Sequence, residues 1–213
     1  MRLRHVKNAK EIIETNSHIV ILNPTEYKGK WNSLFGNDNP IHIEIGMGKG
    51  QFIHKMALLN PNINYIGIEK FDSVICRAIE KLVEDKPANL YLLREDAGRL
   101  LEFFENGEIS RIYLNFSDPW PKAKHEKRRL TFKSFLEMYE QILVSKGAVY
   151  FKTDNKPLFD YSLESIENYG LELKNISYDL ANSGMADNVL TEFEEKHMAM
   201  GEPIYRLEAY KVK

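Results

Sequence analysis

The stretch Ile41-His42-Ile43-Glu44-Ile45-Gly46-Met47-Gly48-Lys49-Gly50 decides the fold. It reads as a short apolar strand that carries an acidic residue near its end and then breaks into alternating glycines. A helical pattern follows at once, with apolar residues at the spacing of one helix face: Phe52, Ile53, Met56 and Ala57. In α/β sheets, a strand, a glycine turn and a helix bring backbone close to a nucleotide-like ligand. The stretch therefore predicts a ligand-binding turn at Gly46, Gly48 and Gly50.

The spacing of this turn bears on the choice of cofactor. It is Glu-x-Gly-x-Gly-x-Gly, whereas dinucleotide sites use Gly-x-Gly-x-x-Gly. Carboxylates near the turn would repel the pyrophosphate of NAD. They suit S-adenosylmethionine, whose ammonium, sulfonium, ribose diol and adenine amino group all favour acceptors. Since many glycine turns only connect elements, the turn alone leaves a purely structural interpretation open.

Length and composition indicate an ordinary globular protein. The chain has 213 residues, 43% of them hydrophobic, which predicts one domain with a sizeable core. It has no apolar run near the ~20 residues of a membrane span, and the residues after Met1 lack the apolar region of a signal peptide. Cys76 is the single cysteine, so we expect no internal disulfide and a cytoplasmic location. The six histidines are scattered, so we expect no metal site.

The formal net charge of −2 conceals strong segregation along the chain. Residues 1–10 carry only basic charges, at Arg2, Arg4, Lys7 and Lys10. Residues 122–133 are also mainly basic, and residues 187–202 are rich in acids. Because local fields decide docking, the near-neutral total does not exclude a polyanionic partner.

Strand-like and helical patterns alternate along most of the chain. Apolar strand-like runs occur at 41–45, 64–68, 90–93, 111–116 and 148–152, with helical periodicity between them. This alternation predicts a doubly wound, Rossmann-like α/β fold with a mainly parallel sheet. Two further runs, 171–178 and 204–211, predict an antiparallel pair that completes seven strands. Residues 1–40 are polar and irregular, so we interpret them as a basic arm or cap before a single domain at 41–213.

Acidic residues stand at or just after the carboxyl end of five predicted strands, where ligands bind in such sheets. They are Glu44, Glu69, Asp96, Asp118 and Asp154. Any one of these acids can simply cap the next helix, and for Asp96 considered by itself this alternative is open. Five strands with the same feature are harder to attribute to capping.

A second motif follows the fourth predicted strand, in the run Asn115-Phe116-Ser117-Asp118-Pro119-Trp120-Pro121-Lys122. The two prolines stiffen this loop and hold Trp120 outside regular structure. The run Lys124-His125-Glu126-Lys127-Arg128-Arg129 comes directly after it. Basic residues beside an aromatic ring suit phosphate docking with base stacking, although a solvated charge run with a core tryptophan is the alternative.

With these motifs in order along almost the whole chain, the sequence resembles the bacterial tRNA (guanine-N7)-methyltransferase family. Phe151-Lys152-Thr153-Asp154-Asn155 and Thr191-Glu192-Phe193-Glu194 add to the resemblance. It implies a class I methyltransferase fold, S-adenosylmethionine as donor, and transfer to N7 of the variable-loop guanine at tRNA position 46. It also implies cofactor binding by Glu44, Glu69, Asp96 and Asp118, and substrate binding by Lys122, Asp154, Thr191, Glu192, Phe193 and Glu194. The block Lys124, His125, Glu126, Lys127, Arg128 and Arg129 would contact RNA.

The expected chemistry agrees with what the sequence contains. Guanine N7 has a lone pair and no proton, so its methylation needs orientation and electrostatics rather than a general base. We favour Asp118 as the catalytic residue, near the centre of methyl transfer, with Asp154 and Glu194 holding the base. An acidic helix start is the alternative interpretation of 191–195.

Other functional classes remain open from the sequence. They are a methyltransferase for another nucleic acid or an exocyclic amine, a non-catalytic RNA-binding module and an NAD oxidoreductase. We expect tRNA as the partner, no membrane, no obligate protein partner, and a monomer or weak homodimer.

Overall fold

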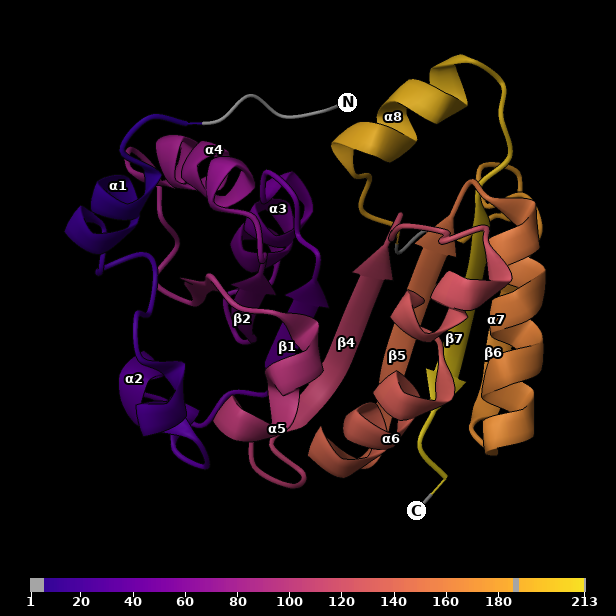
Figure 1. Ribbon diagram of the computed structural model, residues 1–213, viewed down its shortest axis with the longest axis horizontal. Helices are drawn as coiled ribbons and strands as arrows, with labels where there is room; N and C mark the ends of the chain where they lie inside the picture. Colours follow the sequence, from indigo (N-terminus) through magenta and orange to yellow (C-terminus); the bar gives the residue numbers. More distant parts are fainter. Residues whose placement is uncertain (1–5, 186–187, 213) are drawn as a thin grey trace. The chain divides into compact units, whose positions relative to one another are not determined.

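The computed structural model describes residues 6–185 and 188–212, and the chain divides into two compact units (Figure 1). The first unit is Met1–Glu105 and the second is Asn106–Lys213. Arg2 and Arg4 of the expected basic arm lie outside the described residues.

The first unit contains three parallel strands in the order β3-β2-β1. They are β1 (Ile41–Ile45), β2 (Asn64–Ile68) and β3 (Leu90–Leu93). Helix α3 (Gln51–Leu59) connects β1 to β2, and α4 (Asp72–Leu82) connects β2 to β3. Every residue of β1 and β2 is buried, as expected of parallel strands covered on both faces.

The segment before β1 forms part of the core of this unit. It holds α1 (Ala9–Thr15), the 3₁₀ helix η1 (Pro24–Tyr27) and α2 (Trp31–Phe35). Val20 makes a parallel bridge with Leu92 of β3. Trp31 is fully buried, and its Nε1 donates to the carbonyl oxygen of Phe103 at 2.8 Å. Phe103 ends α5 (Leu100–Phe103), which follows the 3₁₀ helix η2 (Ala97–Arg99).

The second unit contains four strands in the order β4-β5-β7-β6. They are β4 (Ile109–Asn115), β5 (Leu143–Thr153), β6 (Glu172–Ser177) and β7 (Tyr205–Tyr210). Strands β4 and β5 are parallel, while β7 is antiparallel to both β5 and β6. The chain therefore inserts its last strand between β5 and β6, and β6 is left at the edge.

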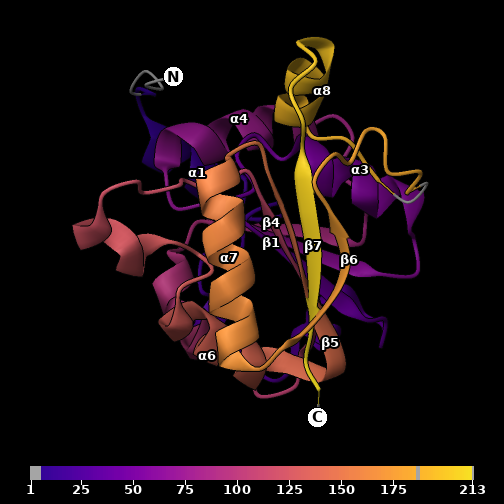
Figure 2. The same ribbon diagram turned by 90° about the vertical axis from the view of Figure 1, so that its right-hand side faces the viewer.

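Four helical segments of the described residues complete the unit. They are the 3₁₀ helix η3 (Ala123–Arg128), α6 (Lys133–Ile142), α7 (Lys156–Tyr169) and α8 (Glu192–Ala199). Two of them, α6 and α7, contact each other and the strands. Helix α7 runs along β5, β7 and β6, as Figure 2 shows. Its Phe159 packs on Phe151 of β5 and Tyr205 of β7, with ring centroids 6.4 and 5.2 Å apart. Helix α8 lies beyond the carboxyl ends of β4 and β5 (Figure 1).

The described residues thus carry the seven-stranded mixed sheet and helical layers that the alternating pattern predicts. The antiparallel pairing of the last strands is also confirmed. Several strand boundaries differ by a residue or two, and the largest difference is at β5: the predicted run is 148–152 and helical periodicity extends to Leu143, whereas β5 already begins at Leu143. Gly147 allows the backbone to pass close to Val144 in the first part of β5, because a Cβ at this position would lie 2.9 Å from the Val144 carbonyl oxygen. In the described part of the chain, no helix has the length and apolar character to cross a membrane.

Candidate active site

The glycine turn follows β1 and adopts backbone conformations that strongly favour glycine. Gly46, Gly48 and Gly50 have φ angles of 74°, 59° and 74°. These values lie in the left-handed region, where a Cβ is strained. A Cβ on Gly46 or Gly48 would meet no atom within 4 Å, whereas one on Gly50 would lie 3.2 Å from the Cβ of Ala78. The first two glycines therefore leave backbone open to a ligand, and the third allows α3 to pack closely on α4.

Glu69, directly after β2, holds this turn in place. Its side chain is buried, and its two oxygens accept from the backbone N–H of Gly48 at 3.2 Å and of Phe71 at 3.0 Å. Burial raises the pKa of the Glu69 carboxyl above its ordinary value, although the backbone N–H groups and the charge of Lys70 oppose that shift. A carboxylate offers about four acceptor positions, so Glu69 can still accept from a ribose diol.

Glu44 of β1 and Met47 of the turn are both buried. Glu44 is only 2% exposed. Met47, to which the sequence assigned no role, is 5% exposed, and its sulfur would collide with a Cβ on Gly67 of β2. Met47 therefore packs under the turn, where Gly67 makes room for it. The pairing of a large apolar residue inside the turn with a glycine in the next strand was the signal for this contact.

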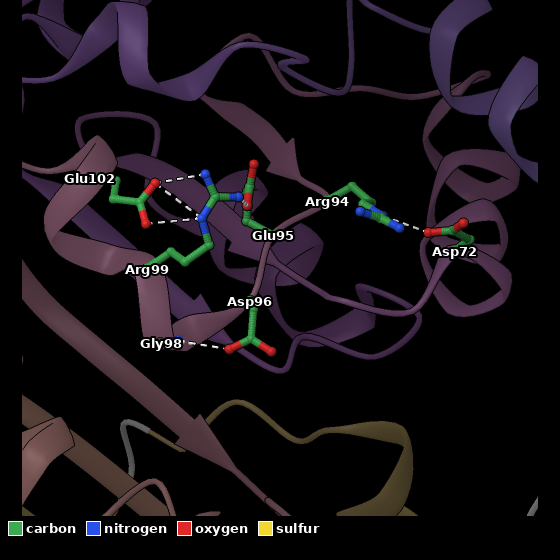
Figure 3. A network of polar contacts seen from close by, with 7 residues as sticks. All are labelled: Asp72, Arg94, Glu95, Asp96, Gly98, Arg99 and Glu102. Atoms are coloured by element: carbon green, nitrogen blue, oxygen red, sulfur yellow. Dashed lines mark hydrogen bonds and ion pairs between the residues drawn. The ribbon is translucent and has the colours of Figure 1, made fainter.

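Asp96 follows β3 and caps the 3₁₀ helix η2. Its Oδ1 accepts from the N–H of Gly98 at 2.8 Å, and its Oδ2 lies 3.9 Å from the Nζ of Lys70. Figure 3 shows that Asp96 stands apart from the ion pairs of Arg99 with Glu95 and Glu102. The capping alternative is thus confirmed. Since the side chain is 56% exposed, capping leaves Asp96 accessible to a ligand.

These features of the first unit match the chemistry of S-adenosylmethionine. The open glycine backbone leaves room for a ligand at Gly46 and Gly48. The acceptors are carboxylates, which suit a diol and cationic groups and disfavour a pyrophosphate. In residues 6–185 and 188–212, no three His, Cys, Asp or Glu side chains gather as a possible metal site.

In the second unit, the loop after β4 is held by backbone contacts and by Arg129. Phe116 and Trp120 have φ angles of 52° and 42°, uncommon for residues other than glycine. Arg129 donates from Nε to the Pro119 carbonyl oxygen at 3.1 Å and from Nη2 to that of Trp120 at 3.2 Å. Its guanidinium also lies over the ring of Tyr161, 4.2 Å from the centroid. Arg129 therefore stabilises the loop that presents the exposed Asp118.

The other residues of the basic block are more accessible. Lys122, Lys124, Lys127 and Arg128 are exposed, while His125 and Glu126 are half-buried. The Arg128 guanidinium lies 4.8 Å from the centroid of Trp120, and the His125 ring meets the same indole edge-on at 5.6 Å. One exposed cation, Arg128, thus lies over a half-buried tryptophan, and three exposed lysines stand in the same run of sequence, where they can take phosphates. Their contact with RNA remains a prediction.

The segment 191–194 begins α8 with a capping box. Thr191 Oγ1 accepts from the N–H of Glu194 at 3.0 Å, and the Glu194 carboxylate accepts in return from the N–H of Thr191. This confirms the acidic helix start as the local structure. Glu192 is half-buried, and Phe193 is 43% exposed with its ring 4.8 Å from that of Phe116. Asp154 lies half-buried just after β5.

Glu194 itself is fully buried and is paired with Lys152 of β5. The Lys152 Nζ lies 2.7 Å from Oε2, and the Nδ2 of Asn188 donates to Oε1 at 2.5 Å. The role of Glu194 in holding a base stays a prediction, but both of its oxygens already have protein partners. Sequence reasoning did not single out Lys152. A lysine within the apolar run of β5 was the available signal, because buried lysines require a partner.

Comparison with known proteins agrees with this architecture. Residues 38–207 match a family model described as "Putative methyltransferase". Two solved structures share the fold: an antibiotic-related methyltransferase has a TM-score of 0.60 at 17% identity, covering 85% of this chain and 92% of its own. The 16S rRNA methyltransferase KamB has a TM-score of 0.61 at 14% identity, covering 85% and 91%.

Close relatives carry one shared name. Proteins named tRNA (guanine-N(7)-)-methyltransferase from Bacillus licheniformis and Bacillus subtilis (strain 168) are 58% and 56% identical, over 98% of both chains in each case. The relative of that name from Geobacillus sp. (strain WCH70) is 59% identical over 98% of this chain and 94% of its own. This chain therefore belongs to the tRNA (guanine-N(7)-)-methyltransferase family.

Proposed function

We propose that the chain transfers a methyl group from S-adenosylmethionine to N7 of a guanine in tRNA. The observation that carries this proposal is the name shared by relatives 55–59% identical over 98% of the chain. The glycine turn held by Glu69 supports the choice of cofactor, because an open backbone and buried carboxylates fit its diol and cationic groups.

In the first unit, the residues would bind and orient the cofactor. S-adenosylmethionine supplies a methyl group activated by a sulfonium. Glu69 would accept from the ribose hydroxyls, since its lone pairs exceed its two backbone donors. Glu44 and Asp96 would accept from the remaining donors of the cofactor, and the backbone at Gly46, Gly48 and Gly50 would allow close approach.

In the second unit, the residues would hold the guanine and favour the transfer. The N7 lone pair forms the new bond to carbon as the sulfur–carbon bond breaks and its electron pair returns to sulfur. No proton leaves, so no base is required, and positive charge moves onto the purine. Asp118 would stabilise that charge by a fixed negative charge. Asp154 would accept from N1–H and the exocyclic amine, a pattern that adenine lacks. Glu192 would share this role in place of Glu194, because both oxygens of Glu194 already have protein partners.

Other residues of the second unit would bind the RNA. Lys122, Lys124, Lys127 and Arg128 are exposed cations suited to phosphates. The half-exposed Phe193 offers a ring for base stacking beside the capped Thr191. Arg129 would act by holding the loop of Asp118, because its donors are directed at backbone carbonyls.

The finer proposals follow from the resemblance. The target would be the variable-loop guanine at tRNA position 46, and the enzyme would act in the cytoplasm as a monomer or weak homodimer. Residues 41–213 would form the catalytic domain and residues 1–40 a cap, in which Val20 pairs with Leu92 of β3 and Trp31 is fully buried within the first unit.

A labelling experiment tests the reaction and the site together. Purified protein is incubated with methyl-labelled S-adenosylmethionine and unmodified tRNA, and aniline cleavage then maps 7-methylguanosine. We expect label and cleavage at guanine 46, and no label in a tRNA that carries adenine there. Label in rRNA or DNA instead would support a different nucleic-acid methyltransferase. Binding of NAD without binding of S-adenosylmethionine would support an oxidoreductase, and RNA binding without turnover would support a binding module.

A further inference from the structure

Lys152 is a buried lysine whose three N–H donors all have partners. Its side chain is 7% exposed in β5. The ammonium donates to Asn188 Oδ1 at 3.0 Å, to the Val189 carbonyl oxygen at 3.1 Å and to Glu194 Oε2 at 2.7 Å. These partners belong to the segment that leads into α8 and to the first turn of α8 itself. One side chain therefore ties the start of α8 to the carboxyl end of β5.

The backbone of Lys152 connects the same point to the loop after β4. Its carbonyl oxygen accepts from the N–H of Phe116 at 2.9 Å, where that loop begins. The Phe116 ring in turn contacts the ring of Phe193 on α8, with centroids 4.8 Å apart. Three segments that carry proposed functional residues thus meet at Lys152. They bear Asp118 after β4, Asp154 after β5 and Glu192 on α8.

We propose that Lys152 is a positioning residue for methyl transfer, and that Glu194 acts through Lys152 rather than by touching the base. Glu194 is fully buried and both oxygens are engaged, which leaves it poorly placed to accept from guanine. The pair sets the position of α8 relative to the loop of Asp118 and to Asp154. This inference rests on the proposed function for its catalytic consequence, since it explains how the guanine-binding carboxylates are held.

Stability alone is a weak reason for such a pair. Ionic groups taken out of water lose hydration, and replacing a buried pair by apolar residues of similar size is often neutral or stabilising. If the pair positions other groups, its removal should instead lower the rate of methyl transfer. Displacement of a reacting group by about 1 Å can cost on the order of 100-fold in rate.

The test replaces both charges at once, because Lys152→Met alone would leave Glu194 buried and uncompensated. The variant Lys152→Met with Glu194→Met is compared with Arg206→Met with Glu208→Met. The control pair is similarly buried on β7, at 5% and 2% exposure, and Arg206 lies opposite Lys152 in the β5–β7 register. Because its ion pair joins two residues of the same strand, the control removes buried charge next to Lys152 and leaves the contact between Lys152 and α8 in place. Circular dichroism and thermal unfolding establish that each variant is folded.

We expect the Lys152 double variant to transfer methyl about 100-fold more slowly in single turnover, while its calorimetric affinity for S-adenosylmethionine stays within about twofold of wild type. The control should keep its rate within about threefold. Glu194→Gln retains the shape and one acceptor, so it should lose less than the double variant. Hydrogen exchange should rise at 116–122 and 188–199 in the Lys152 double variant only.

Transfer at the wild-type rate would overturn the inference. An equal loss of cofactor affinity, or an equal loss in the control pair, would overturn it as well, because the pair would then serve the fold in general. Should the wild type transfer no methyl to tRNA, the proposed function fails separately. Hydrogen exchange in the Lys152 double variant then decides the inference. Unchanged exchange at 116–122 and 188–199 contradicts it, and a rise in both segments supports it.

Discussion

Glu69→Gln is the sharpest test of the cofactor site, because it removes one charge and one acceptor while keeping the shape. The carboxylate accepts two backbone N–H groups, at 3.2 and 3.0 Å, and is proposed to accept two ribose hydroxyls. The amide has one oxygen, so its NH₂ group must face a donor on one side. Ala would remove more, because both the glycine turn and the start of α4 would lose their acceptor.

The expected loss of cofactor affinity in Glu69→Gln follows from the hydrogen bonds that the amide cannot make. A hydrogen bond to a charged group contributes about 1.5–3 kcal/mol. Loss of one such bond to the ribose corresponds to a dissociation constant raised roughly 10- to 140-fold, at about 1.4 kcal/mol per factor of ten. Isothermal titration calorimetry with S-adenosylmethionine measures this directly. Glu102→Gln is the matched control, because Glu102 is an exposed carboxylate paired with Arg99 in the same unit.

The pH dependence gives a second readout for the same residue. Binding needs the ionised carboxylate, and burial raises the pKa of Glu69. Affinity should therefore be full above the raised pKa and decline as pH falls through it, at a higher pH than for an ordinary glutamate. Glu69→Gln should abolish that decline. The free energy of unfolding of the ligand-free protein should change in the opposite sense. It falls as pH rises between the ordinary and the raised pKa, because the folded state holds the proton more tightly.

Two results would refute this reasoning. Unchanged cofactor affinity in Glu69→Gln would show that the ribose does not use this carboxylate. An affinity that falls equally in Glu102→Gln would show that charge in general, rather than the Glu69 acceptor, controls binding.

The fold was predictable because its signals are local and repeated. The apolar runs and glycine turn around Glu44 place β1, and the one-face periodicity of Val74, Ile75, Ala78, Ile79 and Leu82 places α4. Short elements such as η1 and α2 were missed, because Trp31 is fixed by a contact with Phe103, far away in sequence. No periodicity can reveal such a contact.

The candidate site was predictable as a set of positions, and less so as a set of roles. Acids after parallel strands can be located by counting, but the sequence does not show what each one contacts. Asp96 caps η2 and remains exposed, whereas Glu194 is buried against Lys152. Arg129 belongs to a basic run by composition, yet its donors are committed to Pro119 and Trp120. In each case a long-range partner decides between a ligand contact and a structural one.

Three further predictions concern the second unit. Replacing Lys124, Lys127 and Arg128 with Ala should weaken tRNA binding and reduce its log–log salt slope by roughly 0.7–0.9 for each phosphate that the variant no longer neutralises. If filter binding shows an unchanged salt slope for tRNA, these three side chains are solvated surface charges that do not contact phosphates. Arg129→Ala should slow methyl transfer and raise backbone hydrogen exchange in the loop of Asp118, whatever its effect on the salt slope. Lys127→Ala is the control, and equal exchange in the two variants would argue against a structural role for Arg129. Asp118→Asn keeps the shape and removes the charge, so the single-turnover rate should fall strongly while tRNA affinity changes little, the signature of an interaction made in the transition state. Because guanine N7 carries no proton, the wild-type rate should be flat from about pH 6 to 9 with both substrates saturating. A rate that climbs tenfold per pH unit through neutrality would require a general base, and the role proposed for Asp118 would then be wrong.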